Sequence, residues 1–186
     1  MSNRTANYTA FYVSEPFYPS NLGPNTDRDF RYYNMLKAWK ASDETFHFVD
    51  AHAKTYSVRD DSDWEKTLKP RLHERLNASK NIILFLSSIT KDSRALHEEI
   101  DYGINTCHLP VIVVYPDFSE KSDVIDTDGQ FKRQVINLWD KLPIFRNNMN
   151  KVATLHIPLK KDLIKKALYD ESFEVGTMTK IAKYYY

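Results

Sequence analysis

Two adjacent glutamates, Glu98 and Glu99, are the residues whose position points most directly to chemistry. They lie in a stretch of helical spacing that follows Ser87-Ser88. Glu99 is three residues from Leu96 and four from Gly103, so it borders the apolar side of the predicted helix. A carboxylate in such a place can stabilise a developing positive charge, as in cleavage of a glycosidic bond. On these residues alone, a solvated helix acid is the simpler interpretation.

Other kinds of reactive site find little support in the sequence. The glycines form no GxGxxG or P-loop spacing, which excludes a Rossmann oxidoreductase and a P-loop NTPase. The acidic residues and histidines around Asp50 and His52 include no HExxH motif and no calcium-loop glycine, so we expect no metal. Cys107 is the single cysteine and falls on an apolar helical stripe, so a buried, inert thiol is expected.

The elements that would position Glu99 follow from two apolar runs, 82–86 and 111–115. Neither run alternates with polar residues, a pattern typical of parallel strands buried on both faces. A helical pattern over 93–107 lies between them, which predicts a strand-helix-strand crossover.

The same alternation extends in both directions along the chain and predicts a doubly wound α/β fold with about five parallel strands. Pro70 interrupts one of the helices, so that helix either kinks or begins later than the capping-box spacing of Ser62 and Glu65 suggests. Thr26 is a possible N-cap of the helix predicted at 27–41. The remaining strands are expected at 10–13, 46–49 and 153–157, and the remaining helices at 27–41, 62–76, 131–142 and 159–170.

Polar residues follow several of the predicted strands directly. In doubly wound sheets ligands bind outside the carboxyl ends of the strands. Ser14, Asp50, His52 and Ser88 are therefore candidate pocket residues by position. An equally good explanation is that every strand must leave the core through polar residues.

Composition limits the class of protein. With 186 residues the chain has the size of one domain, and we expect a single domain over 1–186. A formal net charge of +1 argues against a nucleic-acid binder that relies on phosphate contacts. The sequence shows no signal peptide and no apolar run long enough for a membrane span, so we expect a cytoplasmic protein without membrane or nucleic-acid partners.

Residues 84–88 (LFLSS) and 93–100 (SRALHEEI) together resemble the third strand and following helix of TIR (Toll/interleukin-1 receptor) domains. Residues 48–52 and 62–65 resemble matching parts of the TIR-like group of the bacterial Thoeris antiphage system. The resemblance covers roughly 8–117, and 118–186 is a strand-helix extension. Ala95 stands where the motif usually has Trp.

The resemblance implies a flavodoxin-like fold and cleavage of the nicotinamide-ribose bond of NAD, with NAD as substrate and no other cofactor. The catalytic glutamate of the family maps to Glu99. The product would be an ADP-ribose-derived messenger, either a cyclic ADP-ribose isomer or a histidine adduct, that activates a separate effector protein. It also implies a small-molecule acceptor, a phage-derived activator and a homo-oligomer.

On that reading NAD would lie across the strand ends, and Phe11 or Tyr12 could contact a base. Two other functions are consistent with the sequence. TIR domains also serve as adaptors without catalysis, which the Ala95 departure slightly favours and Glu99 disfavours. A nucleoside-processing transferase of similar fold would use a carboxylate on a ribose in the same way.

Overall fold

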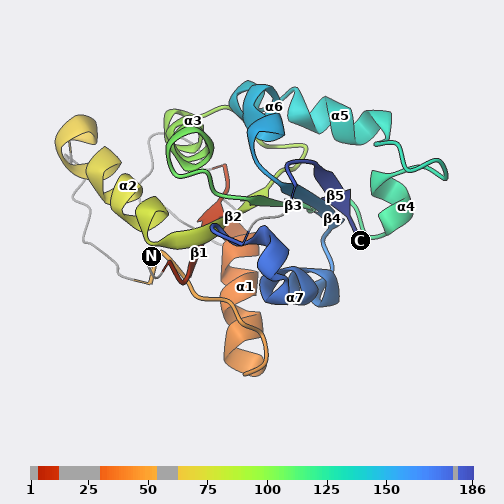
Figure 1. The fold of residues 1–186 in the computed structure, drawn as a ribbon, viewed down its shortest axis with the longest axis horizontal. Coiled ribbons are helices and arrows are strands. Elements are labelled where there is room, and N and C mark those ends of the chain that lie inside the picture. Colours follow the sequence, from red (N-terminus) through yellow and green to blue (C-terminus); the bar gives the residue numbers. More distant parts are fainter. Residues whose placement is uncertain (1–3, 13–29, 54–62, 178–179) are drawn as a thin grey trace.

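A computed structural model of the chain describes residues 4–12, 30–53, 63–177 and 180–186. The strands form one all-parallel sheet whose spatial order follows the sequence (Figure 1). The strands are β1 (Ala6–Ala10), β2 (Ser79–Phe85), β3 (Val111–Tyr115), β4 (Thr154–Pro158) and β5 (Lys183–Tyr185). The predicted α/β, flavodoxin-like class is therefore confirmed.

Helices cover both faces of the sheet (Figure 1). One face carries α1 (Phe30–Ser42) and α7 (Lys161–Tyr169). The other carries α2 (Lys69–Asn77), α3 (Arg94–Asp101), α4 (Lys121–Val124), α5 (Arg133–Trp139) and α6 (Pro143–Asn148). Shorter helical turns are η2 (Trp64–Leu68), η3 (Tyr102–Thr106), η4 (Met149–Lys151) and η5 (Glu171–Phe173). None of the helices in the described ranges is long and apolar enough to cross a bilayer.

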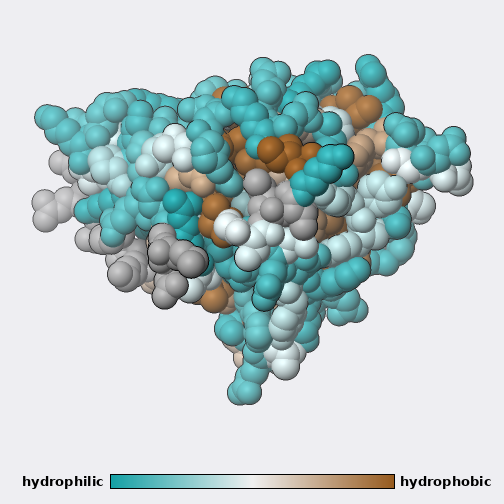
Figure 2. All heavy atoms as spheres, in the orientation of Figure 1, coloured by the Kyte–Doolittle hydropathy of each residue, from teal (hydrophilic) through white to brown (hydrophobic). Residues whose placement is uncertain are grey.

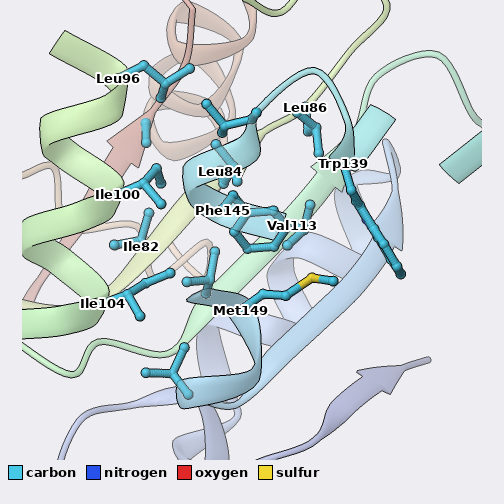
Figure 3. Close-up of a cluster of buried hydrophobic side chains, with 14 of the residues drawn as sticks. Ile82, Leu84, Leu86, Leu96, Ile100, Ile104, Val113, Trp139, Phe145 and Met149 are labelled. Carbon is cyan, nitrogen blue, oxygen red and sulfur yellow. The ribbon is translucent and has the colours of Figure 1, made fainter. Parts of the chain in front are cut away.

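The central strands are buried on both faces, as their unbroken apolar runs predict. Every side chain of β3 is fully buried. Val113 packs toward α3 and α6 within the cluster shown in Figure 3, whereas its neighbours Ile112 and Val114 pack toward α1 and α7. Alternate residues of one strand thus build two cores, one on each face of the sheet.

Most of the surface seen in Figure 2 is hydrophilic, and hydrophobic side chains reach it mainly between the two helix layers. This distribution fits helices that turn one apolar stripe toward the sheet. The stripe of α3 consists of Leu96 and Ile100, and the helix begins where Ser93 Oγ accepts a hydrogen bond from the Leu96 amide. Because α3 follows β2 and runs back over the sheet, Glu99, which lies between Leu96 and Ile100 in the helix, contacts β1.

Two strand predictions differ from the structure. The first strand runs over β1, a few residues before the predicted 10–13. The segment 46–49 is not a strand, and Asp50 alone forms a bridge with Asn7 on the edge of β1. The side-chain oxygen of Asn7 accepts a hydrogen bond from the amide of Val49, at 2.8 Å. This bond occupies an amide that a regular β-ladder would pair with a backbone carbonyl. The fifth strand is instead β5, which the sequence did not indicate.

The helix predicted at 62–76, which Pro70 interrupts, forms two elements in the structure, η2 and α2. A π-helical turn, η2, begins after Asp63, whose side chain accepts from the amide of Lys66. Pro70 lies at the start of α2, where its missing N–H costs least. The helix therefore begins later than Ser62, which lies outside the described residues together with Thr26. The other predicted helices and the strand at 153–157 match α1, α3 with η3, α5, α7 and β4 within a few residues.

Candidate active site

Glu99 lies in the second turn of α3 and contacts the middle of β1. The hydroxyl of Tyr8 donates a hydrogen bond to Glu99 Oε1, at 2.9 Å. Tyr8 is buried, while Glu99 keeps some contact with solvent. Burial raises the pKa of Glu99 to about 8, against the opposing effects of the Tyr8 hydrogen bond and the positive charge of Arg75. A carboxyl of this kind changes its charge within the physiological pH range.

The neighbouring Glu98 points to a different place. Its carboxylate lies 2.7 Å from His73 Nε2 and 3.4 Å from Lys69 Nζ, both on α2. One residue of helix, about 100° of rotation, thus separates an ion-paired surface acid from an acid that faces β1. The structure agrees with the choice of Glu99 over Glu98 as the residue bordering the apolar face.

His52 packs beside Tyr8 at the outer edge of β1. The two ring centroids are 4.7 Å apart. His52 Nε2 lies 3.0 Å from the carbonyl oxygen of Thr9, and Nδ1 lies 3.4 Å from Arg75 Nη1. Burial and the charge of Arg75 lower the pKa of His52 to about 4. His52 is therefore a neutral, fixed side chain in this arrangement.

Asp50 connects His52 with helix α1. Its Oδ1 accepts from the amide of His52 at 2.9 Å, and its Oδ2 accepts from the hydroxyl of Tyr33 at 2.7 Å. The Tyr33 ring stacks on Phe11, with centroids 5.7 Å apart, just after the carboxyl end of β1. Burial and the hydrogen bond to Asp50 raise the pKa of the Tyr33 hydroxyl. The predicted residues Asp50, His52 and Phe11 thus form one connected cluster with Tyr33.

The other predicted pocket residues lie elsewhere or outside the description. Tyr12 packs against the core on the α2 and α3 face. Ser88 is exposed, and its amide donates to Asp117 Oδ2, which joins the loops after β2 and β3. Ser14 lies outside the described residues. The described part of the chain holds no cluster of three or more His, Cys, Asp or Glu side chains placed to share a metal ion.

Three residues of the site were missed by sequence reasoning: Tyr8, Tyr33 and Arg75. Tyr8 precedes the strand start that the sequence suggested, and its role depends on a contact with α3. Arg75 lies between Leu72 and Leu76, the buried residues of α2. The sequence does show that Arg75 borders the buried stripe of α2, which is unusual for an arginine. It does not show that His52 is the partner of Arg75.

An indole ring contacts helix α3 even though Ala95 stands where the motif has Trp. Trp64, in η2, lies under the guanidinium of Arg94, 4.6 Å from its ring centroid. Trp64 also packs against the core of this face. Trp64 therefore comes from a segment outside α3 and contacts Arg94, the residue that precedes Ala95.

A family model supports the same region of the chain. The model described as "Thoeris protein ThsB, TIR-like domain" matches residues 8–121. This range runs from Tyr8 in β1 to the start of α4 and includes Asp50, His52, Arg75 and Glu99. All residues of the cluster therefore lie within the matched part, whereas β4 and β5 follow it.

Proposed function

The chain belongs to the TIR-like family of the Thoeris defence protein ThsB, and from this premise we propose that it is an enzyme that consumes NAD. It would cleave the nicotinamide-ribose bond and make an ADP-ribose-derived signalling nucleotide. The observation that carries this proposal is the placement of Glu99, a carboxyl that is held against β1 by Tyr8 and that ionises near neutral pH.

The chemistry requires a negative charge next to the nicotinamide-side ribose. When the C–N bond breaks, its electron pair leaves with nicotinamide and the sugar carbon becomes oxocarbenium-like. A carboxylate in a site of low dielectric stabilises that charge more than it stabilises the ground state. An acceptor then bonds to the anomeric carbon and loses a proton. The acceptor is water, a hydroxyl of the same molecule, or an external group.

The raised pKa of Glu99 links substrate binding to ionisation. In the free protein near pH 7, the neutral form of the carboxyl predominates because its pKa is about 8. The positively charged nicotinamide ring of NAD would favour the carboxylate when it binds nearby. Tyr8 would keep Oε1 in place by its hydrogen bond, and Oε2 would accept from a ribose hydroxyl.

The remaining site residues would bind the rest of the substrate. Phe11 stacks with Tyr33 at the carboxyl end of β1 and could offer an aromatic surface to a base. Asp50 and His52 would shape the same edge of the site. Tyr12, Ser14 and Ser88 are kept as positional candidates for binding.

The product would act through other molecules. In this proposal a phage-derived signal activates the enzyme, a homo-oligomer completes its sites, and a separate effector senses the messenger. The messenger would be a cyclic ADP-ribose isomer or a histidine adduct of ADP-ribose.

The direct test is mass spectrometry of small molecules from phage-infected cells that express the wild-type protein or Glu99→Gln. We expect an ADP-ribose-derived compound in the wild-type cells alone, and its mass identifies the acceptor. If both strains show the same compounds while protection from phage persists, the chain acts as an assembly module instead. If nucleosides and not NAD are turned over, it is a nucleoside-processing transferase.

A further inference from the structure

His52 holds the side chain of Arg75 in a defined position. A guanidinium can only donate hydrogen bonds, so His52 Nδ1 is the acceptor in the 3.4 Å contact with Arg75 Nη1. The ring proton is then on Nε2, which donates to the carbonyl oxygen of Thr9 at 3.0 Å. Both ring nitrogens of His52 are therefore occupied. His52 is not a proton carrier here, but it connects the backbone of β1 with the guanidinium.

The guanidinium and Glu99 come from two adjacent helices. Arg75 is on α2, Glu99 is on α3, and these helices pack against each other. Tyr8 and His52 connect the two groups: the Tyr8 hydroxyl bonds Glu99, the Tyr8 ring packs against His52, and His52 contacts Arg75. The positive charge of Arg75 lowers the pKa values of Tyr8, Tyr33, His52 and Glu99 alike. Arg75 thus lies within electrostatic reach of the whole cluster.

The other charged groups around α3 are engaged with different partners. Asp50 is bonded to the Tyr33 hydroxyl and to the amide of His52. Three ion pairs or networks use several of the groups on or next to α2, η2 and α3: Glu98 with His73 and Lys69, Arg94 with Glu65, and His97 with Asp92. Among the described residues, Arg75 is the cation whose charge acts on Glu99.

We propose that Arg75 is a positioning residue for the reaction: His52 fixes its guanidinium next to α3, and its charge keeps the Glu99 carboxyl ionised when substrate is bound. The inference rests on the proposed function for its role in turnover. Substrate binding would displace water, and the attraction between two charges grows as the dielectric falls. The contact between His52 and Arg75 orients the guanidinium, and it thereby controls the fraction of Glu99 that is ionised.

Titration of the Glu99 carboxyl tests the electrostatic part without any substrate. Carboxyl ¹³C NMR of the full-length protein, labelled at glutamate, gives the midpoint for Glu99 in each variant, and Glu99→Gln assigns the signal. We expect Arg75→Met to raise the midpoint by about 1 pH unit, because an opposite charge nearby lowers a carboxyl pKa by roughly 1–3 units. Arg75→Lys keeps the charge and should retain most of the wild-type value.

Two further variants separate position from charge. Lys69→Met removes a charge from the same helix, at a residue that pairs with Glu98, and should leave the Glu99 midpoint unchanged. His52→Phe keeps a ring beside Tyr8 but removes the acceptor for Arg75, so it should raise the midpoint by less than Arg75→Met does. Thermal unfolding of each variant checks that it is folded, and His52→Phe decides the question if Arg75→Met is not. An unchanged Glu99 midpoint in folded Arg75→Met overturns the proposal, as does a wild-type midpoint in His52→Phe.

The pH profile of nicotinamide release tests the catalytic part. With a midpoint raised by one unit in the free enzyme, Arg75→Met should lose about tenfold in kcat/KM at pH 7 and recover toward wild type above pH 9. An equal loss at every pH would mean that Arg75 acts in some other way and would overturn the positioning role. If even the wild type releases no nicotinamide in activated extracts, the proposed function fails, and the NMR titration still decides whether Arg75 sets the charge of Glu99.

Discussion

Two buried clusters in the sheet use the same residue types in opposite ways. One of them, the core cluster, consists of Tyr115, Trp139, Thr154 and His156. The Trp139 indole N–H donates to the Tyr115 hydroxyl at 2.7 Å, and that hydroxyl donates to His156 Nδ1 at 2.6 Å. The proton of His156 is then on Nε2, which donates to Thr154 Oγ1 at 2.9 Å. The side chains therefore satisfy one another, and burial lowers the pKa of His156 to about 3.

The other, the site cluster around Tyr8, His52 and Glu99, contains a tyrosine and a histidine as well, but it also contains a carboxyl. Tyr8 bonds Glu99, and burial raises the pKa of Glu99 to about 8. Buried polar groups that are fully paired stabilise one conformation, whereas a buried carboxyl without a full set of partners costs stability when it ionises. The comparison shows that the core cluster serves the fold and the site cluster keeps a group whose charge can change.

The largest difference between the clusters should appear in turnover. Glu99→Gln keeps the size of the side chain but removes its charge, so nicotinamide release should fall on the order of 10²-fold or more. Rates in extracts of infected cells, which would contain the proposed activator, provide the measurement. Glu98→Gln is the matched control, because its acid pairs with His73 and Lys69 on α2, and it should retain its rate. Loss of activity in Glu98→Gln alone would place the reactive carboxyl one residue earlier.

Breaking the core cluster should affect stability and leave the chemistry intact. Tyr115→Phe removes the hydroxyl that bonds both Trp139 and His156, and leaves two buried polar atoms unpaired. Each such atom costs about 1–3 kcal/mol, so the free energy of unfolding should fall by about 2–6 kcal/mol. Urea denaturation measures this loss. A stability within experimental error of the wild type would show that the hydrogen-bonded chain contributes nothing.

The sign of the pH dependence separates the two clusters further. Glu99 has a pKa of about 8 in the folded protein against 4.5 as its ordinary value. Its contribution to stability is therefore fully present below pH 4.5 and is lost as the pH rises through 8. Glu99→Gln removes this loss, so the variant should be more stable than the wild type at pH 9 by about 1–2 kcal/mol. This is less than the full pKa shift of Glu99 implies, because the side chain is partly exposed to solvent.

Urea denaturation of wild type and Glu99→Gln at pH 5 and pH 9 measures this difference. The gap should close at pH 5, where both side chains are neutral in the folded state. A gap that is the same at both pH values would mean that Glu99 is not a buried, titrating carboxyl.

The smallest effect is expected for Tyr8→Phe. The Tyr8 hydrogen bond lowers the pKa of Glu99, so its loss should raise that pKa and reduce turnover at pH 7 by up to about tenfold. The ring still packs against His52, which keeps the fold. Turnover across pH 6–10 measures the effect, and recovery at high pH is the expected signature. An equal loss at all pH values would indicate that the hydroxyl contacts the substrate directly.

Much of the fold is predictable from the sequence because it depends on local patterns. The apolar runs in β2 and β3 admit few alternatives to buried parallel strands, and the stripe of α3 places Glu99 on the correct side. The prediction of a strand at 46–49 was wrong, because the segment bonds β1 at the distant Asn7, through the backbone and the side chain of that residue, and not along a ladder. Likewise β5, at 183–185, is too short for a pattern and forms because β4 offers it an edge.

The site is only partly predictable for the same reason. Glu99, Asp50 and His52 stand out by type and by position after a strand or beside a helical stripe. Tyr8 and Arg75 acquire their roles from contacts across more than twenty residues of sequence, which no periodicity encodes. His156 was expected in a strand, but the network that fixes its tautomer involves β3, β4 and α5.

The pH dependence of kcat/KM for nicotinamide release tests the central claim most directly, because it reports the ionisation of the free enzyme. If Glu99 acts as a carboxylate, kcat/KM of the wild type should rise with pH and level off above a midpoint near 8. Glu99→Gln should be slow at every pH and show no such rise. A wild-type profile that is flat from pH 6 to pH 10, or a Glu99→Gln profile with the same rise, would contradict the account.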